Sequence, residues 1–229
     1  MNTAKKERVI ALAGNPNSGK TTVFNNLTGA RQHVGNWPGV TVEKKEGTCS
    51  YQGYHLKVVD LPGVYSLTAY SPDEIIARNF IVDEKPEAVV DIVDASSLER
   101  NLYLTVQLIE LEVNLVVALN MTDMAKSRDY RIDVDQLSDL LGAPVVPMVA
   151  SRKEGTEELL KQIVNTLDGK TNNKKIKLYY GSELEEHINE LEEIISRDEK
   201  LSHQFPPRWL AIKLLEEDKE VLQKIESKL

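Results

Sequence analysis

The sequence predicts an α/β protein in which helices cover both faces of a mostly parallel sheet, followed by a small all-helical domain. Over residues 1–169, short apolar runs alternate with segments of helical periodicity, which is typical of a parallel sheet packed between helices. Residues 170–229 show helical periodicity alone. The length of 229 residues suits one large domain with a small companion. The short helices either pack with the first domain or belong to a unit that the end of the sequence truncates.

The first elements can be placed from apolar runs and turn residues. Residues 9–13 form an apolar run that ends in a glycine-rich turn, which predicts a buried strand. Residues 19–28 carry apolar residues on one helical face, and Gly29 marks the end of that helix. Two further strands are predicted at 40–51 and 54–60, joined by a short turn.

The second half of this domain continues the alternation. Apolar runs predict strands, and amphipathic spacing predicts helices. Pro72 favours a helix start, and Gly142 favours a helix end. The expected elements are helices at 73–83, 98–111, 134–141 and 155–167, and strands at 88–94, 114–120 and 145–149.

The pattern changes after Asp168. Residues 169–177 are polar and rich in Lys and Asn, which predicts a linker. Beyond them, apolar residues recur at helical spacings of three and four at Leu184, Ile188, Leu191 and Ile195. Pro207 is expected to begin a later helix.

Composition excludes several classes of protein. The formal net charge of −8 argues against a broad nucleic-acid footprint. The single cysteine, Cys49, allows no internal disulfide and fits a reducing compartment, and we expect it to be a small buried side chain. The polar first eight residues are unlike a secretion signal. No window approaches the roughly 20 apolar residues of a membrane helix, so we expect this chain to be soluble and cytosolic.

The strongest motif lies between the first predicted strand and helix. Residues 14–21 read GNPNSGKT and match GxxxxGK[ST]. Backbone N–H groups and a helix N-terminus in such a loop stabilise the dense negative charge of a triphosphate. We expect Lys20 at the β- and γ-phosphates and the Thr21 hydroxyl on magnesium. The nucleotide-binding residues expected here are Gly14, Asn15, Pro16, Asn17, Ser18, Gly19, Lys20, Thr21 and Thr22.

A second motif predicts the choice of base. Asn120, Met121 and Asp123 belong to NMTD, which follows a predicted strand at the edge where α/β sheets bind ligands. The Asp123 carboxylate can accept two N–H groups from guanine that adenine does not offer, and an unpaired buried carboxylate disfavours adenine. Guanine-nucleotide proteins usually carry Lys at the second position, and the Met121 side chain can pack on the base in its place.

The third motif, DLPG at residues 60–63, ends another predicted strand. We expect Asp60 to hold magnesium, through water, and the Gly63 N–H to contact the γ-phosphate. Thr41 is the candidate to complete the magnesium shell when a γ-phosphate is present. Its segment, residues 31–42, is glycine-rich and is expected to be a mobile switch, with Gly39 and Val40 beside Thr41 at the nucleotide. Trp37 in this segment either packs on the domain or contacts a partner.

Three further places in the sequence bear on the mechanism. Val149, Ala150 and Ser151 follow a strand where a backbone N–H, that of Ala150, can donate to the guanine O6. Position 64 holds Val instead of a water-orienting Gln, so slow intrinsic hydrolysis or another source of charge stabilisation is expected. Asn17 either shapes the loop or offers its amide oxygen to a monovalent cation between the α- and γ-phosphates. We expect Lys20, Asn17, Thr41 and Gly63 to act in the chemical step.

These residues resemble a particular family. The segments GNPNSGKTT, VGNWPGVTVEKKEG, DLPGVYSL, NMTD and PPRWLAIKLLE are similar to the N-terminal cytosolic region of the bacterial ferrous-iron transport protein B family. The similarity runs from about residue 8 to 215. WPGVTVEKKEG and RWLAIKLLE are more specific to this family than the general nucleotide-binding motifs.

The resemblance implies a Ras-like P-loop GTPase domain at 1–169 and a GDI-like helical domain at 170–229 that favours the GDP-bound form. It implies a GTPase that uses GTP/GDP and Mg²⁺, with K⁺ bound by Asn17 and regulation of Fe²⁺ uptake as its role. The partner would be a membrane-spanning iron permease in the same protein, which places this domain at the cytoplasmic face of the bacterial membrane. We find no iron site in the sequence.

Two other functions remain to be weighed. An RNA- or ribosome-associated assembly GTPase would act as a binding module, and the acidic balance and lack of a basic appendage disfavour it. A P-loop ATPase is disfavoured by NMTD.

Overall fold

The computed structural model describes residues 6–171 and 176–227. The chain forms two compact units. The first comprises Met1–Ile109 and Val113–Lys175, and the second comprises Glu110–Glu112 and Ile176–Leu229. The predicted linker at 169–177 includes residues 172–175, which lie outside the described residues.

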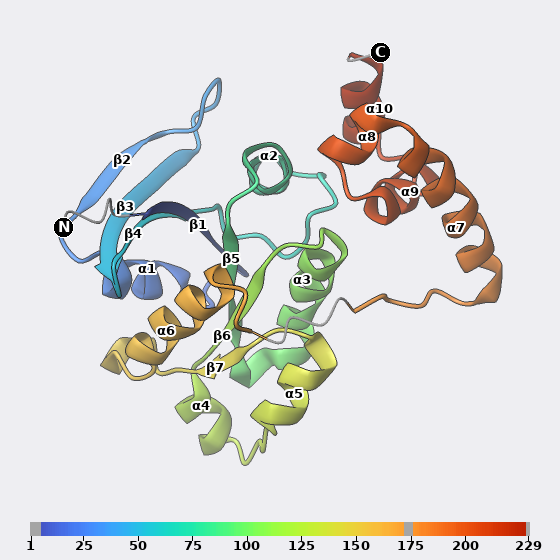
Figure 1. Cartoon of the computed structure of the whole chain (residues 1–229). Coiled ribbons are helices and arrows are strands. Elements are labelled where there is room, and N and C mark those ends of the chain that lie inside the picture. The colour runs from blue at the N-terminus through green and yellow to red at the C-terminus, as the bar shows by residue number, and fades with distance from the viewer. Residues whose placement is uncertain (1–5, 172–175, 228–229) are drawn as a thin grey trace. The chain divides into compact units, whose positions relative to one another are not determined.

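A sheet of seven strands organises the described part of the first unit (Figure 1). The strands lie in the order β2-β3-β4-β1-β5-β6-β7. They are β1 (Lys6–Gly14), β2 (Gln32–Asn36), β3 (Glu43–Tyr51), β4 (Tyr54–Asp60), β5 (Ala88–Asp94), β6 (Leu115–Asn120) and β7 (Val145–Pro147). The pairs from β4 to β7 are parallel, whereas β2 and β3 are antiparallel to their neighbours. The mostly parallel sheet is therefore confirmed.

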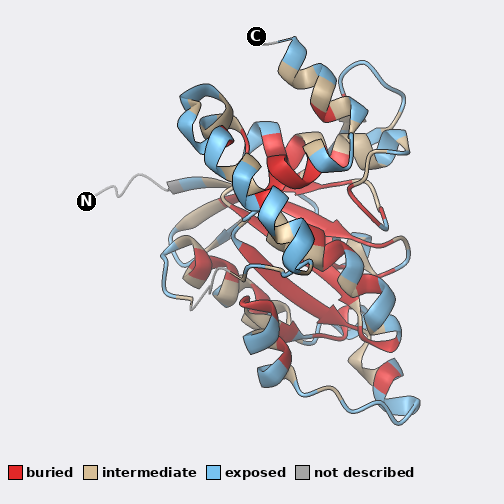
Figure 2. Ribbon diagram, turned by 90° about the vertical axis from the view of Figure 1, so that its right-hand side faces the viewer, coloured by how far each residue is buried: buried red, intermediate tan, exposed pale blue. Residues whose placement is uncertain are grey.

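Helices cover both faces of this sheet (Figure 2). They are α1 (Lys20–Thr28), α2 (Pro72–Asn79), α3 (Leu98–Glu110), α4 (Thr122–Ser127), α5 (Val134–Leu141) and α6 (Thr156–Leu167). A π-helical turn at Phe80–Glu84 extends α2, and 3₁₀ turns lie at Ala95–Ser97 and Ala150–Arg152.

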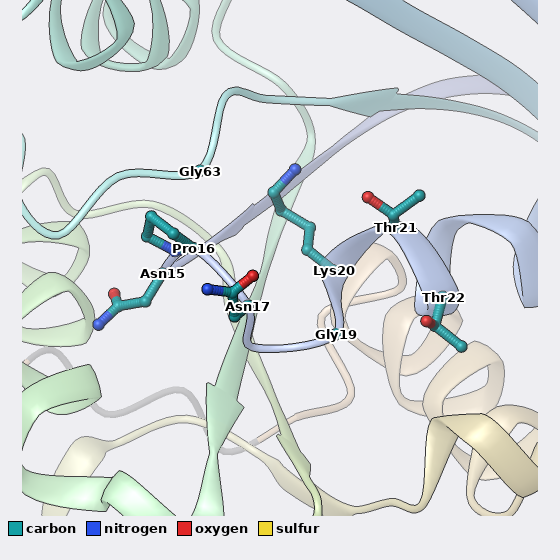
Figure 3. A pocket seen from close by; sticks show the side chains of 8 residues that line it. All are labelled: Asn15, Pro16, Asn17, Gly19, Lys20, Thr21, Thr22 and Gly63. Atoms are coloured by element: carbon teal, nitrogen blue, oxygen red, sulfur yellow. The ribbon is translucent and has the colours of Figure 1, made fainter.

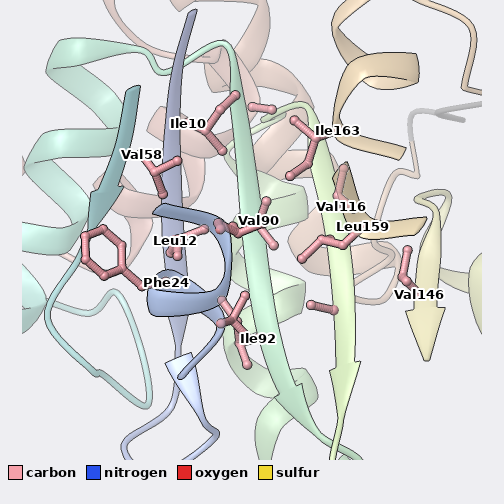
Figure 4. Close-up of a cluster of buried hydrophobic side chains, with 14 of the residues drawn as sticks. Ile10, Leu12, Phe24, Val58, Val90, Ile92, Val116, Val146, Leu159 and Ile163 are labelled. Atoms are coloured by element: carbon pink, nitrogen blue, oxygen red, sulfur yellow. The ribbon is translucent and has the colours of Figure 1, made fainter. Parts of the chain in front are cut away.

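The core explains why the apolar runs became central strands. Phe24 of α1 and Leu159 and Ile163 of α6 point at side chains of the strands, among them Val90 and Val116 (Figure 4). All five residues are fully buried or nearly so. Such burial of large apolar side chains is the main favourable term in folding, at roughly 1.5–3 kcal/mol for each side chain.

The structure differs from the predicted elements at three places. The predicted strand at 40–51 begins only at Glu43, and the segment before it contains β2, which the sequence did not predict. The predicted strand at 145–149 ends at Pro147. Helix α4 was also missed, because it begins within the NMTD motif itself. The other predicted elements of this unit are confirmed to within a few residues of their ends, the helix at 73–83 with the π-helical turn as its last part.

The second unit consists, in its described part, of α7 (Ser182–Arg197), α8 (Glu199–Gln204), α9 (Pro207–Leu215) and α10 (Lys219–Glu226). Pro207 does begin a helix, as predicted. The rings of Phe205 and Trp209 stack with centroids 5.9 Å apart. Arg208 of α9 donates from both terminal nitrogens to Glu185 of α7, at 3.1 and 2.7 Å. In the described residues, no helix has the length and apolar character needed to cross a membrane.

Candidate nucleotide-binding site

The loop between β1 and α1 forms one wall of a polar pocket. The pocket has a volume of about 510 Å³, within the roughly 300–1,000 Å³ of small-molecule sites. Its lining residues are Asn15, Pro16, Asn17, Gly19, Lys20, Thr21, Thr22 and Gly63. Gly63 lies across from the loop in Figure 3. The fold thus brings the first and third motifs to one pocket.

Local backbone geometry explains the residues of this loop. Gly19 has φ +91°, and a Cβ there would lie 2.2 Å from Asn120 Nδ2, so the position requires glycine. Asn17 also has a left-handed backbone, with φ +66°, which asparagine tolerates better than most residues. Helix α1 begins at Lys20, and its free N–H groups therefore open toward the pocket.

The ammonium group of Lys20, in the GNPNSGKT motif, is paired with a carboxylate of the same chain. Lys20 Nζ forms an ion pair with Asp60, and both side chains are largely buried. Burial raises the pKa of Asp60 above its ordinary value, and the Lys20 ammonium opposes that rise. A positive charge therefore stands beside the carboxylate that was predicted to hold magnesium.

The Thr21 hydroxyl at this pocket and the Asp60 carboxylate beside Lys20 are oxygen donors that fit a hard divalent cation. The Thr21 hydroxyl is at the pocket, and the Asp60 carboxylate is the group that Lys20 neutralises. Hydroxyl and carboxylate oxygens are the ligands that Mg²⁺ prefers. In the described part of the chain, no group of three or more His, Cys, Asp and Glu residues could hold a metal ion.

Thr41, Gly39 and Val40 are exposed and do not line the pocket. They belong to the turn between β2 and β3, which the Trp37 N–H closes by donating to Val42 O at 2.9 Å. The predicted mobile segment is therefore a paired strand over Gln32–Asn36 and a hydrogen-bonded turn over the residues that follow. Thr41 and the pocket are not brought together here.

Trp37 is buried, with 7 % of its surface exposed. Its ring meets the Phe80 ring edge to face at a centroid distance of 5.5 Å. The Lys44 ammonium lies 4.8 Å from the centre of the Trp37 ring. Of the two interpretations drawn from sequence, packing on the domain is the one seen.

The NMTD motif is joined to the phosphate loop by one side chain. Asn120 donates from Nδ2 to Ser18 O at 2.9 Å and accepts from the Ala150 N–H at 2.9 Å. It is 3 % exposed. Because the Ala150 N–H is used in this way, it is not free for a base oxygen. Asn120 thus ties together three segments that lie far apart in the sequence.

Asp123 is in place at this edge but is already paired. Its carboxylate accepts from the Met124 N–H at 3.0 Å and from Arg152 Nη2 at 3.2 Å. Met121, the residue just before α4, has φ +59° and lies near Gly19. The pairing of Arg152 with Asp123 was not predicted, and neither residue spacing nor composition signals it.

Sequence reasoning also missed the role of α3. Asn15 donates from Nδ2 to Arg100 O of this helix at 3.4 Å. Asn101 accepts from the Asp94 N–H at 3.2 Å, and Thr105 donates to Asp91 at 2.6 Å. These are polar residues on an otherwise apolar helix face, and that irregularity is the signal that could have found them.

Fold and site together define a Ras-like G domain of the P-loop class, joined to a helical unit. Comparison with protein families agrees with this class. The model of the family described as "Ferrous iron transport protein B" matches residues 8–163, and that of "FeoB cytosolic helical domain" matches residues 180–229. The chain belongs to the ferrous iron transport protein B family.

Individual relatives agree. The Fe(2+) transporter FeoB of Escherichia coli K12 is 46 % identical over 218 residues, which is 93 % of this chain and 27 % of that protein. A Fe(2+) transport protein A/FeoB fusion protein of Porphyromonas gingivalis is 43 % identical over 93 % of this chain and 25 % of its own length. The chain therefore spans about a quarter of the length of these relatives.

Solved structures show the same fold. The cytosolic domain of the T. maritima FeoB iron transporter in a GDP form has a TM-score of 0.89 and 41 % identity, covering 95 % of this chain and 85 % of that one. Its GMPPNP form has a TM-score of 0.88, with 95 % and 84 % covered. The FeoB G-domain of Methanococcus jannaschii is 56 % identical with a TM-score of 0.64, covering 71 % of this chain and 99 % of that one.

Proposed function

We propose that this chain is the GTP-binding and GTP-hydrolysing regulatory domain of a ferrous-iron uptake transporter. The observation that carries the proposal is the pair of Asn120 hydrogen bonds, which joins the phosphate loop, the NMTD motif and the Val149–Ser151 segment. A phosphate pocket and a base-reading carboxylate on one rigid frame suit a guanine nucleotide. The GDP and GMPPNP forms of the T. maritima relative support the same ligand class.

Asp123 is the proposed base-reading group. Guanine presents N1–H and N2–H₂ donors to a carboxylate. Adenine would leave that carboxylate unpaired, which costs several kcal/mol of binding free energy. A backbone N–H of the Val149–Ser151 segment would donate to the guanine O6 atom. Since the Ala150 N–H serves Asn120, the N–H of Ser151 is the better-placed donor.

The test is a calorimetric titration with GDP, ADP and XDP in magnesium buffer. Wild type should bind GDP with a Kd at least about a hundredfold below that of ADP. Asp123→Asn should lose GDP and gain XDP, because xanthine carries a carbonyl where guanine carries the N2 amine. Met124→Leu, beside the motif, is the matched control and should behave as wild type. Folded wild type that takes up no guanine nucleotide would refute the proposal.

Magnesium would be held by Thr21 and Asp60, with Thr41 added when a γ-phosphate is present. The ion pair between Lys20 and Asp60 supports this arrangement, because a cation, the Lys20 ammonium, lies beside this carboxylate, and Lys20 itself lines the pocket. On binding, Lys20 would turn to the β- and γ-phosphates. The metal would then neutralise charge that develops on the phosphate oxygens.

Potassium would bind at Asn17. The left-handed backbone of Asn17 and its place at the pocket support this role. A monovalent cation between the α- and γ-phosphates would supply the charge stabilisation that Val64 cannot.

The role in iron uptake rests on the family. An iron permease within the same protein would be the partner, and the domain would face the cytoplasm. The corresponding test uses the intact transporter. Lys20→Ala should abolish both GTP turnover and Fe²⁺ uptake into cells. An RNA- or ribosome-associated GTPase, the alternative, would instead show turnover stimulated by RNA and uptake unaffected by Lys20→Ala.

A further inference from the structure

The segment after DLPG is held by its backbone. Val64 is 4 % exposed, so its side chain faces the core and cannot reach a water molecule. Its N–H donates to Gly14 O at 3.2 Å, and the Leu61 N–H donates to Leu12 O at 3.0 Å. Gly63 therefore stands between two residues that are both bonded to the strand and loop that precede α1.

A second fixed point lies three residues further on, at Leu67. Its N–H donates to Gln107 Oε1 of α3 at 2.6 Å. Its carbonyl accepts from Arg78 Nη1 of α2 at 3.5 Å. Leu67 and Gln107 are 2 % and 8 % exposed. Both backbone polar groups of one buried residue are thus satisfied by side chains of two different helices.

Of the residues between these points, Tyr65 also contacts α3. The guanidinium of Arg100 lies 4.2 Å from the centre of the Tyr65 ring. Arg100 stands seven residues before Gln107, or two helical turns, so both lie on the same face of α3. The carbonyl of Arg100 in turn accepts from Asn15 of the phosphate loop. Helix α3 therefore bonds the phosphate loop at one end and the segment after DLPG at the other.

From this geometry we propose that Gln107 is a positioning residue for GTP hydrolysis. It fixes Leu67 and thereby holds residues 63–67 in the path that presents the Gly63 N–H to the γ-phosphate. Gln107 touches no nucleotide and acts through the backbone of this segment. In this protein, a glutamine on α3 holds in place a segment that has no glutamine of its own at position 64. The inference rests on the proposed GTPase function.

Two substitutions separate positioning from mere packing. Gln107→Met keeps the length of the side chain but removes the acceptor, which leaves the Leu67 N–H buried without a partner. Gln107→Glu keeps an oxygen where Oε1 stands, and a carboxyl accepts from an N–H whether ionised or protonated. Gln162→Met on α6 is the matched control, because the Gln162 side chain donates to Glu158 of its own helix and, among the described residues, bonds no other element.

The measurements are single-turnover GTP hydrolysis, GDP affinity and hydrogen exchange of the Leu67 amide. Gln107→Met should lower kcat about tenfold. This is the effect of losing one hydrogen bond of ordinary net strength in the transition state, here the bond from the Gly63 N–H to the γ-phosphate. GDP affinity should stay within about twofold, because GDP lacks the γ-phosphate that Gly63 would contact. Gln107→Glu and Gln162→Met should hydrolyse GTP at nearly the wild-type rate.

Exchange of the Leu67 amide should quicken in Gln107→Met alone. If kcat and GDP affinity fall together, or if Gln107→Glu fails to restore the rate, Gln107 is a packing residue and the proposal is wrong. Unchanged exchange at Leu67 would refute it as well. If Gln107→Met does not fold, Gln107→Asn, which withdraws the acceptor by one carbon, carries the same expectations. Wild type that binds no GTP would contradict the proposed function instead, while the exchange result would still stand.

Discussion

Asp60 and Asp123 each face a cation supplied by the chain, and this bears on how a nucleotide would enter. Mg²⁺ would replace Lys20 beside Asp60, and guanine would replace Arg152 beside Asp123. The second pair is about half exposed, so it is worth at most about 1 kcal/mol and opposes binding little. The first pair is largely buried, and its replacement by magnesium keeps the Asp60 charge compensated. Under the proposed function, binding would therefore be an exchange of partners at both ends of the site.

The cation assigned to Asn17 gives the first prediction at this scale. Replacing K⁺ with Na⁺ should slow GTP turnover sharply in wild type, because the smaller Na⁺ would fit a site of K⁺ size less well. Asn17→Ala should turn over slowly in both salts, with GDP affinity little changed. Steady-state phosphate release in matched chloride salts measures this. Equal rates for wild type in K⁺ and Na⁺ would remove the potassium site from the proposal.

A second prediction concerns Asp91, which lies inside the sheet on β5. Complete burial raises the pKa of Asp91 from 3.8 to about 7, although the hydrogen bond from Thr105 opposes the rise. The folded protein therefore holds this proton at pH values where the unfolded chain has lost it. The free energy of unfolding should fall as pH rises from about 4 to about 7, and stay lower above that.

Asp91→Asn removes this titration while keeping an oxygen for Thr105. The variant should gain stability over wild type as pH rises through this window, reaching roughly 2–4 kcal/mol near pH 8, and should match wild type near pH 4. Urea unfolding of both proteins across this range provides the comparison, since other titrating groups cancel in the difference. Parallel curves for the two proteins would show that Asp91 does not titrate in this range.

At the scale of elements, the buried central strands were predictable from sequence, whereas the exposed edge strand β2 was not. The strands β5 and β6 are buried along almost their whole length, so they read as unbroken apolar runs. Strand β2 was missed because its sequence, QHVGN, is mostly exposed at the sheet edge and has no apolar alternation. The motif residues were predictable because phosphate and base chemistry restricts the residue types. Their partners in this conformation, Lys20 with Asp60 and Arg152 with Asp123, depend on tertiary packing and were not.

The hairpin of β2 and β3 leads to a prediction about Trp37. Thr41 lies outside the pocket, so a triphosphate that recruits it must move the turn that Trp37 closes. The Trp37 indole N–H is buried and has no hydrogen-bond partner among the residues that the structure describes, which costs roughly 1–3 kcal/mol in this conformation and favours its release. In a Trp209→Phe background, Trp37 is the sole tryptophan. Its emission should be blue-shifted without ligand and move to the red with GMPPNP and Mg²⁺.

GDP and Mg²⁺ are the internal control for this experiment, because they offer no γ-phosphate to recruit Thr41 and should leave the emission unchanged. Thr41→Ala should abolish the response to GMPPNP while leaving the starting spectrum intact. An emission maximum that stays fixed with GMPPNP would show that Trp37 remains packed on Phe80 throughout, and that the hairpin does not open.

At the scale of the whole molecule, the division into two units sets what each can do alone. The predicted boundary at 169/170 lies a few residues before the division at 175/176. The sheet, the phosphate loop and the base-reading edge all belong to the first unit. The solved G-domain of the M. jannaschii relative covers 71 % of this chain, which indicates that such a unit can fold by itself. We therefore expect residues 1–175 to be folded and to bind guanine nucleotide.

The helical unit should act on that binding through linkage. If this GDI-like unit favours the GDP-bound form, its removal must weaken GDP binding. By linkage, the factor equals the one by which bound GDP favours the arrangement of the unit that stabilises GDP. Deleting residues 176–229 should speed GDP release, measured with a fluorescent GDP chased by unlabelled nucleotide. Arg208→Met in the full chain, which breaks the bond to Glu185 within the unit, should shift the release rate in the same direction. An unchanged rate in both proteins would show that the helical unit has no influence on GDP, whatever it does for the rest of the transporter.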